Sequence, residues 1–215
     1  KQYTIYRNKM LFEHSVHKAK QSHLFRKIIL VIQKNHKKYL KNYNKKNIKV
    51  IYGGSERYKS SMIAIKYLSK YKPKNIFIHD AARPNFTLNL LKKLNKRLEN
   101  RSNAIPYVNE ENSVKLKKGN QFTNLDRDKV YLTQTPQCFN FKFISKLICN
   151  NNSEYTDESS LILNNRQRIN FVKGEKFNSK ITNKINENFD KIRYGIGFDV
   201  HRLVKSRKLY LGGIL

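Results

Sequence analysis

Hydrophobic positions along the chain alternate between short β-branched runs and longer stretches in which apolar residues recur every three or four positions. The short runs predict buried strands, and the longer stretches predict amphipathic helices. In the first half, strands are predicted at residues 27–32, 46–52 and 75–79, and helices at residues 10–20, 56–70 and 87–99. Strands that alternate with helices in this way predict an α/β fold, with a mostly parallel, twisted sheet and helices on both faces.

The middle of the chain departs from this alternation. Short strand-like segments follow one another at residues 104–108, 113–117, 121–125 and 130–133. Lys118-Gly119-Asn120 is a turn signal between two of them, so they predict a β-arm that protrudes from the α/β body. Beyond the arm, the pattern predicts helices at residues 141–149, 157–163 and 183–192 and a strand at residues 169–172.

The last stretch of the chain, residues 193–215, is punctuated by glycines and carries too few residues to build a core of its own. We therefore predict one domain over residues 1–192 and the beginning of a second, incomplete domain over residues 193–215.

The charge balance first suggests a polyanionic partner. The sequence has 45 Lys and Arg residues against 15 Asp and Glu, a formal net charge of +30, and clustered cations of this kind bind nucleic acid. The basic residues are dispersed over nearly every segment, however, and no helix-turn-helix, zinc-finger or RNA-binding signature accompanies them. Compositional drift is the preferred interpretation, and a nucleic-acid partner is not expected.

The remaining composition is typical of a soluble cytoplasmic protein. No apolar run approaches the roughly 20 residues that a membrane span needs, and no leader-like segment opens the chain. The two cysteines, Cys138 and Cys149, fit neither a disulfide framework nor the spacing of a zinc site. We expect a cytoplasmic protein without membrane association.

Two candidate sites follow predicted strands. Gly53-Gly54 lies between a strand and a helix, where backbone N–H groups can approach an anion, although an ordinary tight turn has the same sequence. Asp80 and Arg83 follow the strand at residues 75–79. A carboxylate at a strand end can hold Mg²⁺, and an arginine can grip a phosphate; a helix cap with a surface ion pair is the alternative.

Three further segments are weaker signals when each is taken alone. Thr135 lies in a turn beside Pro136, where a hydroxyl can bind a polyol or a base. Thr156-Asp157-Glu158 has the sequence of a helix N-cap with acidic first-turn residues. Lys180 is one lysine among many in a basic chain.

In their order and spacing, these segments together resemble the 2-C-methyl-D-erythritol 4-phosphate cytidylyltransferase family. The opening Lys1-Gln2-Tyr3 is similar to the family's segment just after its glycine-rich nucleotide loop. The tail over residues 195–202, with residues 209–213, is similar to the start of 2-C-methyl-D-erythritol 2,4-cyclodiphosphate synthase. The two enzymes occur fused in that order in some bacteria.

The resemblance implies a Rossmann-like nucleotidyltransferase that transfers CMP from CTP to 2-C-methyl-D-erythritol 4-phosphate and releases pyrophosphate. Asp80 would bind Mg²⁺ and substrate, with Arg83 beside it. Thr135 would bind the methylerythritol phosphate, as would Lys180, which is counted among the catalytic residues. Lys1 would be the lysine that stabilises the transition state.

The resemblance also implies a nucleotide pocket and a dimer. The cytidine pocket would be lined by Gly53, Gly54 and Ser60. Ser113, a substrate contact, and Arg127, a catalytic residue, would reach the partner subunit's site through the arm, which makes a homodimer part of the mechanism.

This chain departs from the family pattern at several points. The glycine-rich loop and a second catalytic arginine belong upstream of Lys1, so the chain as given is expected to be inactive or nearly so. Ser113 stands where the family usually has Thr, and it keeps the hydroxyl. In the tail, Asp199 and His201 match ligands of the synthase's divalent metal, such as Zn²⁺ or Mn²⁺, but two ligands fall short of the usual three.

Other functions remain open from the sequence. A cytidylyltransferase for another polyol phosphate, such as ribitol 5-phosphate, shares the fold and several motifs. A basic nucleic-acid-binding module and an inactive remnant are further alternatives. Intact candidate residues at every position argue against a remnant: Lys1, Asp80, Arg83, Arg127 and Lys180.

Overall fold

Strands and helices follow the predicted order along the chain in the computed structural model, which describes residues 2–41, 43, 46, 48–151 and 153–182. The strands are β1 (Ile5–Tyr6), β2 (Lys9–Met10), β3 (Ile28–Ile32), β4 (Ile48–Tyr52), β5 (Asn75–Ile78), β6 (Asn103–Asn109), β7 (Val114–Lys118), β8 (Gln121–Leu125), β9 (Tyr131–Thr133), β10 (Gln137–Asn140) and β11 (Phe171–Lys173). The helices are α1 (Leu11–Gln21), α2 (Arg57–Ser69), α3 (Leu88–Leu98), α4 (Phe141–Cys149) and α5 (Glu158–Asn164), with 3₁₀ segments η1 (Lys34–Leu40) and η2 (Arg127–Lys129).

The predicted helices that fall on described residues are confirmed to within one residue at each end. The predicted helix at residues 183–192 and the predicted start of a second domain at residues 193–215 lie outside the described residues.

The sheet is mixed in direction, which corrects part of the prediction. Its strand order is β11–β6–β10–β5, and β9 pairs with β6. β11 and β6 are parallel, whereas β10 runs antiparallel to both β5 and β6. β10 was not predicted, because a four-residue strand that continues directly into α4 has no hydrophobic periodicity of its own.

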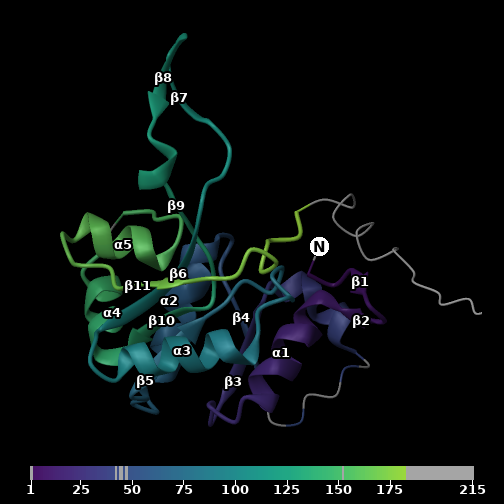
Figure 1. Cartoon of the computed structure of the whole chain (residues 1–215). Helices are drawn as coiled ribbons and strands as arrows, with labels where there is room; N and C mark the ends of the chain where they lie inside the picture. The colour runs from purple at the N-terminus through teal and green to yellow at the C-terminus, as the bar shows by residue number, and fades with distance from the viewer. Residues whose placement is uncertain (1, 42, 44–45, 47, 152, 183–215) are drawn as a thin grey trace, which may run out of the picture. The chain divides into compact units, whose positions relative to one another are not determined.

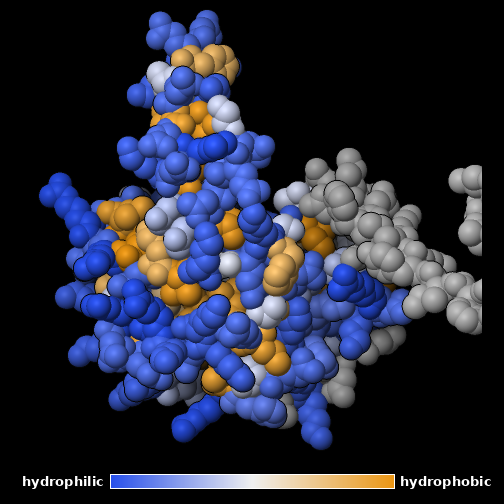
Figure 2. All heavy atoms as spheres, viewed as in Figure 1, coloured by the Kyte–Doolittle hydropathy of each residue, from blue (hydrophilic) through white to orange (hydrophobic). Residues whose placement is uncertain are grey.

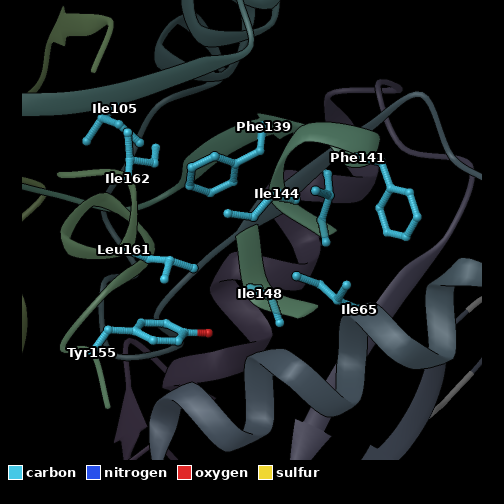
Figure 3. Close-up of a cluster of buried hydrophobic side chains, with 10 residues drawn as sticks. Ile65, Ile105, Phe139, Phe141, Ile144, Ile148, Tyr155, Leu161 and Ile162 are labelled. Atoms are coloured by element: carbon cyan, nitrogen blue, oxygen red, sulfur yellow. The ribbon is translucent and has the colours of Figure 1, made fainter. Parts of the chain in front are cut away.

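Helices cover both faces of this sheet, as predicted. Neighbouring residues of β10 point to opposite faces: Phe139 packs in a cluster with residues of α2, α4 and α5, and Cys138 packs against α3. Figure 3 shows the first cluster, in which Ile144 and Ile148 of α4 lie with Leu161 of α5. This two-sided burial fixes the ends of the sheet strands that carry the candidate site.

β3 and β4 form a separate parallel sheet that packs against α1. Between β3 and β5 lies a largely apolar cavity of about 170 Å³. Its lining includes Phe12 and Val16 of α1, Ile29 of β3 and Phe77 of β5. The two sheets are therefore separated by apolar side chains in the part of the chain that the structure describes.

The predicted arm is confirmed. β7 and β8 form an antiparallel hairpin closed at Gly119, which has a φ of +59°, and Figure 1 shows the hairpin extending away from the body. Large apolar side chains are exposed on it: Leu116 (40%), Phe122 (65%) and Leu125 (41%). Figure 2 shows hydrophobic patches among the hydrophilic side chains of this protruding hairpin. None of the helices in the described part of the chain has the length and apolar character that crossing a bilayer requires.

Candidate active site

Asp80 lies two residues beyond the end of β5 and is surrounded by three cationic side chains. Arg57 Nε approaches Asp80 Oδ1 at 3.1 Å, Lys180 Nζ approaches Oδ2 at 3.2 Å, and Arg83 Nε lies 4.0 Å from Oδ2. Burial raises the pKa of Asp80, but Arg57 and Lys180 outweigh it and hold that pKa below its ordinary value. Asp80 is therefore a carboxylate at neutral pH, and cations face both of its oxygens.

A second carboxylate, Glu158, holds Arg57 in place. Its two oxygens accept from Arg57 Nη1 at 3.1 Å and from Nη2 at 2.8 Å, and the Glu158 side chain is fully buried. Arg57 is the first residue of α2, and Glu158 is the first residue of α5. The ion pair therefore joins two helix N-termini beside Asp80.

The backbone of Asp80 is held through Thr135. The Asp80 N–H donates to Thr135 Oγ1 at 3.0 Å, and that oxygen lies 3.0 Å from His79 Nδ1. Burial lowers the pKa of His79 to about 4, so its ring is neutral at pH 7. The hydroxyl then donates to Nδ1, and the opposite N–H donates to the Arg83 carbonyl oxygen at 3.1 Å. Thr135 is only 4% exposed, and its hydroxyl is hydrogen-bonded within the protein, to Asp80 and His79.

The segment that carries Lys180 is fastened to the sheet by buried amides. Asn178 Nδ2 donates to the Thr135 carbonyl oxygen at 2.9 Å, and Arg83 Nη1 donates to the Asn178 carbonyl oxygen at 2.9 Å. Gln134 Nε2 donates to the Glu175 carbonyl oxygen at 2.8 Å. Together with the contacts of Asp80, they bring Asp80, Arg83, Thr135 and Lys180 into one cluster.

The predicted nucleotide residues form one turn at the start of α2. The Gly53 N–H donates to the Ile32 carbonyl oxygen at 2.8 Å, and Ser60 Oγ donates to the Gly54 carbonyl oxygen at 3.5 Å. A Cβ at Gly53 would overlap both Ser60 Oγ and Val31 Cγ1. Glycine is therefore required by close packing at this turn.

The arm residues make their contacts within the arm region. Arg127 is exposed, and its Nη1 donates to the Glu111 carbonyl oxygen at 2.9 Å. Ser113 Oγ accepts from Lys115 Nζ at 2.9 Å. Neither of these two contacts involves Asp80. Lys1, Asp199 and His201 lie outside the described residues.

Arg57, Glu158 and His79 had no predicted role in the site, although each lies within a few residues of a predicted site residue or motif. The available signal was the acidic start of a predicted helix at Glu158, which is also the ordinary pattern of a helix N-terminus. Glu158 is buried by its contact with Arg57, which is 101 positions away in the sequence, so no local pattern indicates this contact.

Metal-binding groups are sparse in the described residues, which contain no cluster of three or more His, Cys, Asp or Glu side chains able to hold an ion. Asp80 is the carboxylate closest to the candidate phosphate-binding cations. Mg²⁺ is commonly held by one or two carboxylates together with water and substrate phosphates, and a single Asp80 carboxylate meets that requirement when phosphates are present.

Comparison with known proteins identifies the family to which the chain belongs. The family model described as "IspD: 2-C-methyl-D-erythritol 4-phosphate cytidylyltransferase" matches residues 1–188. The whole chain is 46% identical over 215 residues to a "Bifunctional enzyme IspD/IspF" from Pelagibacter ubique, and it spans 58% of that relative's length. It is 31% identical over 192 residues to a 2-C-methyl-D-erythritol 4-phosphate cytidylyltransferase from Thermosipho melanesiensis, covering 86% of this chain and 85% of the relative.

Solved structures give the same fold. A 4-diphosphocytidyl-2C-methyl-D-erythritol synthase from Anaerococcus prevotii matches with a TM-score of 0.77 at 26% identity, covering 87% of this chain and 90% of its own. The bifunctional IspDF from Campylobacter jejuni matches with a TM-score of 0.75 at 27% identity, covering 89% of this chain and 48% of its own. The chain therefore belongs to the 2-C-methyl-D-erythritol 4-phosphate cytidylyltransferase family.

Proposed function

We propose that the full-length protein transfers CMP from CTP to 2-C-methyl-D-erythritol 4-phosphate and releases pyrophosphate. The observation that carries this proposal is the cluster of Arg83 and Lys180 around Asp80 at the carboxyl end of β5, in a chain of this family. Three cations against the carboxylates of Asp80 and Glu158 leave the cluster with one excess positive charge, which suits a phosphate.

The reaction requires two anions to be aligned. An oxygen of the 4-phosphate attacks the α-phosphorus of CTP, the bond from that phosphorus to the bridging oxygen breaks, and pyrophosphate leaves with the bonding electrons. Lys180 is suited to binding the attacking phosphate, because its side chain is 42% exposed and therefore accessible to substrate. It contacts the Asp80 side chain, which is only 16% exposed. Arg83 is more buried and is fixed through Asn178. Such fixed cations lower the repulsion between the reacting groups.

We assign Mg²⁺ to Asp80 together with substrate phosphates. When bound, the ion neutralises phosphate charge. The structural support is the position of Asp80 and the anionic state of its carboxylate. Asp80 also contacts Lys180. We propose that Lys180 moves from Asp80 to the substrate phosphate when the phosphate binds, which frees the carboxylate for Mg²⁺.

For the nucleotide, we assign Gly53, Gly54 and Ser60 to the cytidine pocket. The support is that they share one close-packed turn at the start of α2. There, backbone groups can hydrogen-bond to a base edge. Lys1 is assigned to stabilising the transition state, on the resemblance of its motif to the family's.

We further propose a homodimer in which the arm brings Ser113 and Arg127 to the partner subunit's site. The support is the exposure of the arm, with apolar side chains at Leu116 and Phe122 that a second surface would cover. In one chain, Arg127 donates to a backbone carbonyl oxygen in the arm region.

The remaining proposals concern the full-length protein. Residues 193–215 would begin a cyclodiphosphate synthase domain, with Asp199 and His201 as ligands of a divalent metal such as Zn²⁺ or Mn²⁺. The bifunctional relatives support this arrangement. A cytoplasmic location follows from the metabolic role.

The test is pyrophosphate release by the full-length protein with CTP and Mg²⁺. We expect turnover with 2-C-methyl-D-erythritol 4-phosphate and little with ribitol 5-phosphate at equal concentration. Faster release with ribitol 5-phosphate would assign the second polyol as substrate, and no release with either would overturn the proposed activity.

A further inference from the structure

The guanidinium of Arg57 bridges two carboxylates. Its two terminal nitrogens face the two oxygens of Glu158, at 3.1 and 2.8 Å, while Nε faces Asp80 Oδ1 at 3.1 Å. Glu158 is fully buried, and Arg57 is 30% exposed. A bidentate pair of this kind fixes the orientation of the arginine plane as well as its position.

The orientation of Arg57 determines which oxygen of Asp80 is available. Because Oδ1 is held by Arg57 Nε, Oδ2 is directed to Lys180 at 3.2 Å and to Arg83 at 4.0 Å. Glu158 also balances the charge of Arg57, so the Asp80 charge is left for the two cations assigned to phosphate. Without this pair, the Asp80 carboxylate could turn and neutralise Lys180 and Arg83 with both oxygens.

The pair also connects both halves of the candidate site. Arg57 begins α2, directly after the turn of Gly53 and Gly54, and Glu158 begins α5. A movement of the nucleotide turn would therefore be transmitted to Asp80 through a single rigid side chain.

We propose that Arg57, held by Glu158, is a positioning residue that orients the Asp80 carboxylate for binding of methylerythritol phosphate by Lys180 and Arg83. This role rests on the proposed function. Arg57 acts through Asp80 and is assigned no contact with substrate.

The deciding experiment removes both charges of the pair together. In the full-length protein, Arg57→Met with Glu158→Leu replaces a buried ion pair by apolar side chains of comparable size, which commonly preserves stability. We expect a melting temperature close to that of the wild type. We also expect kcat/KM for methylerythritol phosphate to fall by about tenfold or more, the size expected when a charge-assisted hydrogen bond is lost. The KM for CTP should change less than about threefold, since the glycine turn is intact.

Two further variants serve as comparisons. Arg57→Lys keeps the positive charge, but its point-like ammonium cannot replace the planar fork that spans both carboxylates, so a smaller loss in kcat/KM is expected. Lys96→Met with Glu99→Leu removes one charge of each sign from the exposed face of α3 and should leave both substrates' constants unchanged.

Each outcome decides the proposal. If the double variant at the pair keeps its melting temperature and the wild-type kcat/KM, the pair is structural only and the positioning role is wrong. Should the double variant fail to fold, a folded Arg57→Lys variant with full activity would overturn the proposal equally, and one with selective loss toward methylerythritol phosphate would support it. If the wild-type protein releases no pyrophosphate, the proposed function fails and the positioning role falls with it.

Discussion

The site around Asp80 and the arm both carry arginines with proposed roles in the reaction, but the two regions hold these arginines in different ways. In the body, Arg57 and Arg83 are fixed by carboxylates and carbonyl oxygens from several elements. On the arm, Arg127 is exposed and donates to the backbone of Glu111. The body cluster is pre-organised by several contacts within its own chain, whereas Arg127 lies on the exposed arm and contacts a backbone carbonyl oxygen.

The difference has a physical basis in the surrounding structure. Strand ends buried between helices can hold charge in a fixed geometry, since each buried polar group must be paired. A two-stranded hairpin alone is at best marginally stable in water, and this one exposes Leu116, Phe122 and Leu125. The comparison indicates that the cluster around Asp80 is held in place by its own chain, whereas the arm requires another surface.

The largest expected effect comes from neutralising the centre of the body site. Asp80→Asn in the full-length protein leaves Arg57, Arg83 and Lys180 without their shared carboxylate. We expect kcat/KM for pyrophosphate release to fall by about 100- to 1000-fold, the range for loss of one pre-organised electrostatic group. Glu99→Gln, on the exposed end of α3, is the control. Near-normal Mg²⁺-dependent activity in Asp80→Asn would remove Asp80 from the metal and substrate assignment.

Arg127→Ala tests the other side of the comparison. We expect kcat/KM for methylerythritol phosphate to fall by about 10- to 100-fold, as for a lost charge-assisted hydrogen bond, with CTP affinity little changed. Because Arg127 is exposed, the melting temperature should stay within about 1 °C of the wild type. Arg101→Ala, an exposed arginine after α3, is the matched control. A selective loss of CTP affinity would instead assign Arg127 to the nucleotide.

The contrast between body and arm also separates what could be predicted from sequence. The helices and the arm hairpin depend on local periodicity and on the Gly119 turn, and these were predicted to within a residue or two. β10 was missed, because its four residues gain their strand conformation by pairing with β5 and β6, which are distant in sequence.

The candidate site shows the same division. Asp80, Arg83, Thr135 and Lys180 were predicted individually, by strand-end position and by resemblance to a family. The partner relations were not predictable, since Arg57 meets Glu158 across 101 residues and no local pattern encodes that contact. The same limit applies to Thr135, whose hydroxyl was predicted to bind substrate and lies buried between Asp80 and His79.

Thr135→Val sharpens this last point. The substitution keeps the shape and removes the acceptor for the Asp80 N–H and the donor to His79 Nδ1. We expect the free energy of unfolding to fall by about 1–3 kcal/mol, because two buried polar groups lose a partner. Denaturant titration measures the change. Thr123→Val on the exposed β8 strand should change it by less than about 0.5 kcal/mol. An unchanged stability in Thr135→Val would show that the hydroxyl is available to substrate after all.

The smallest expected effect concerns Ser113, which stands where the family usually carries Thr. Its hydroxyl accepts from Lys115 on the exposed arm, so Ser113→Ala should leave folding unchanged. If the hydroxyl serves the partner subunit's site, Ser113→Ala lowers kcat/KM for methylerythritol phosphate by about three- to tenfold, the value of one neutral hydrogen bond. Ser113→Thr keeps the hydroxyl and should retain activity within about twofold. Equal activity in the serine, threonine and alanine forms would show that the hydroxyl has no part in substrate binding. Of the two arm residues, Arg127 alone would then remain as a proposed substrate contact.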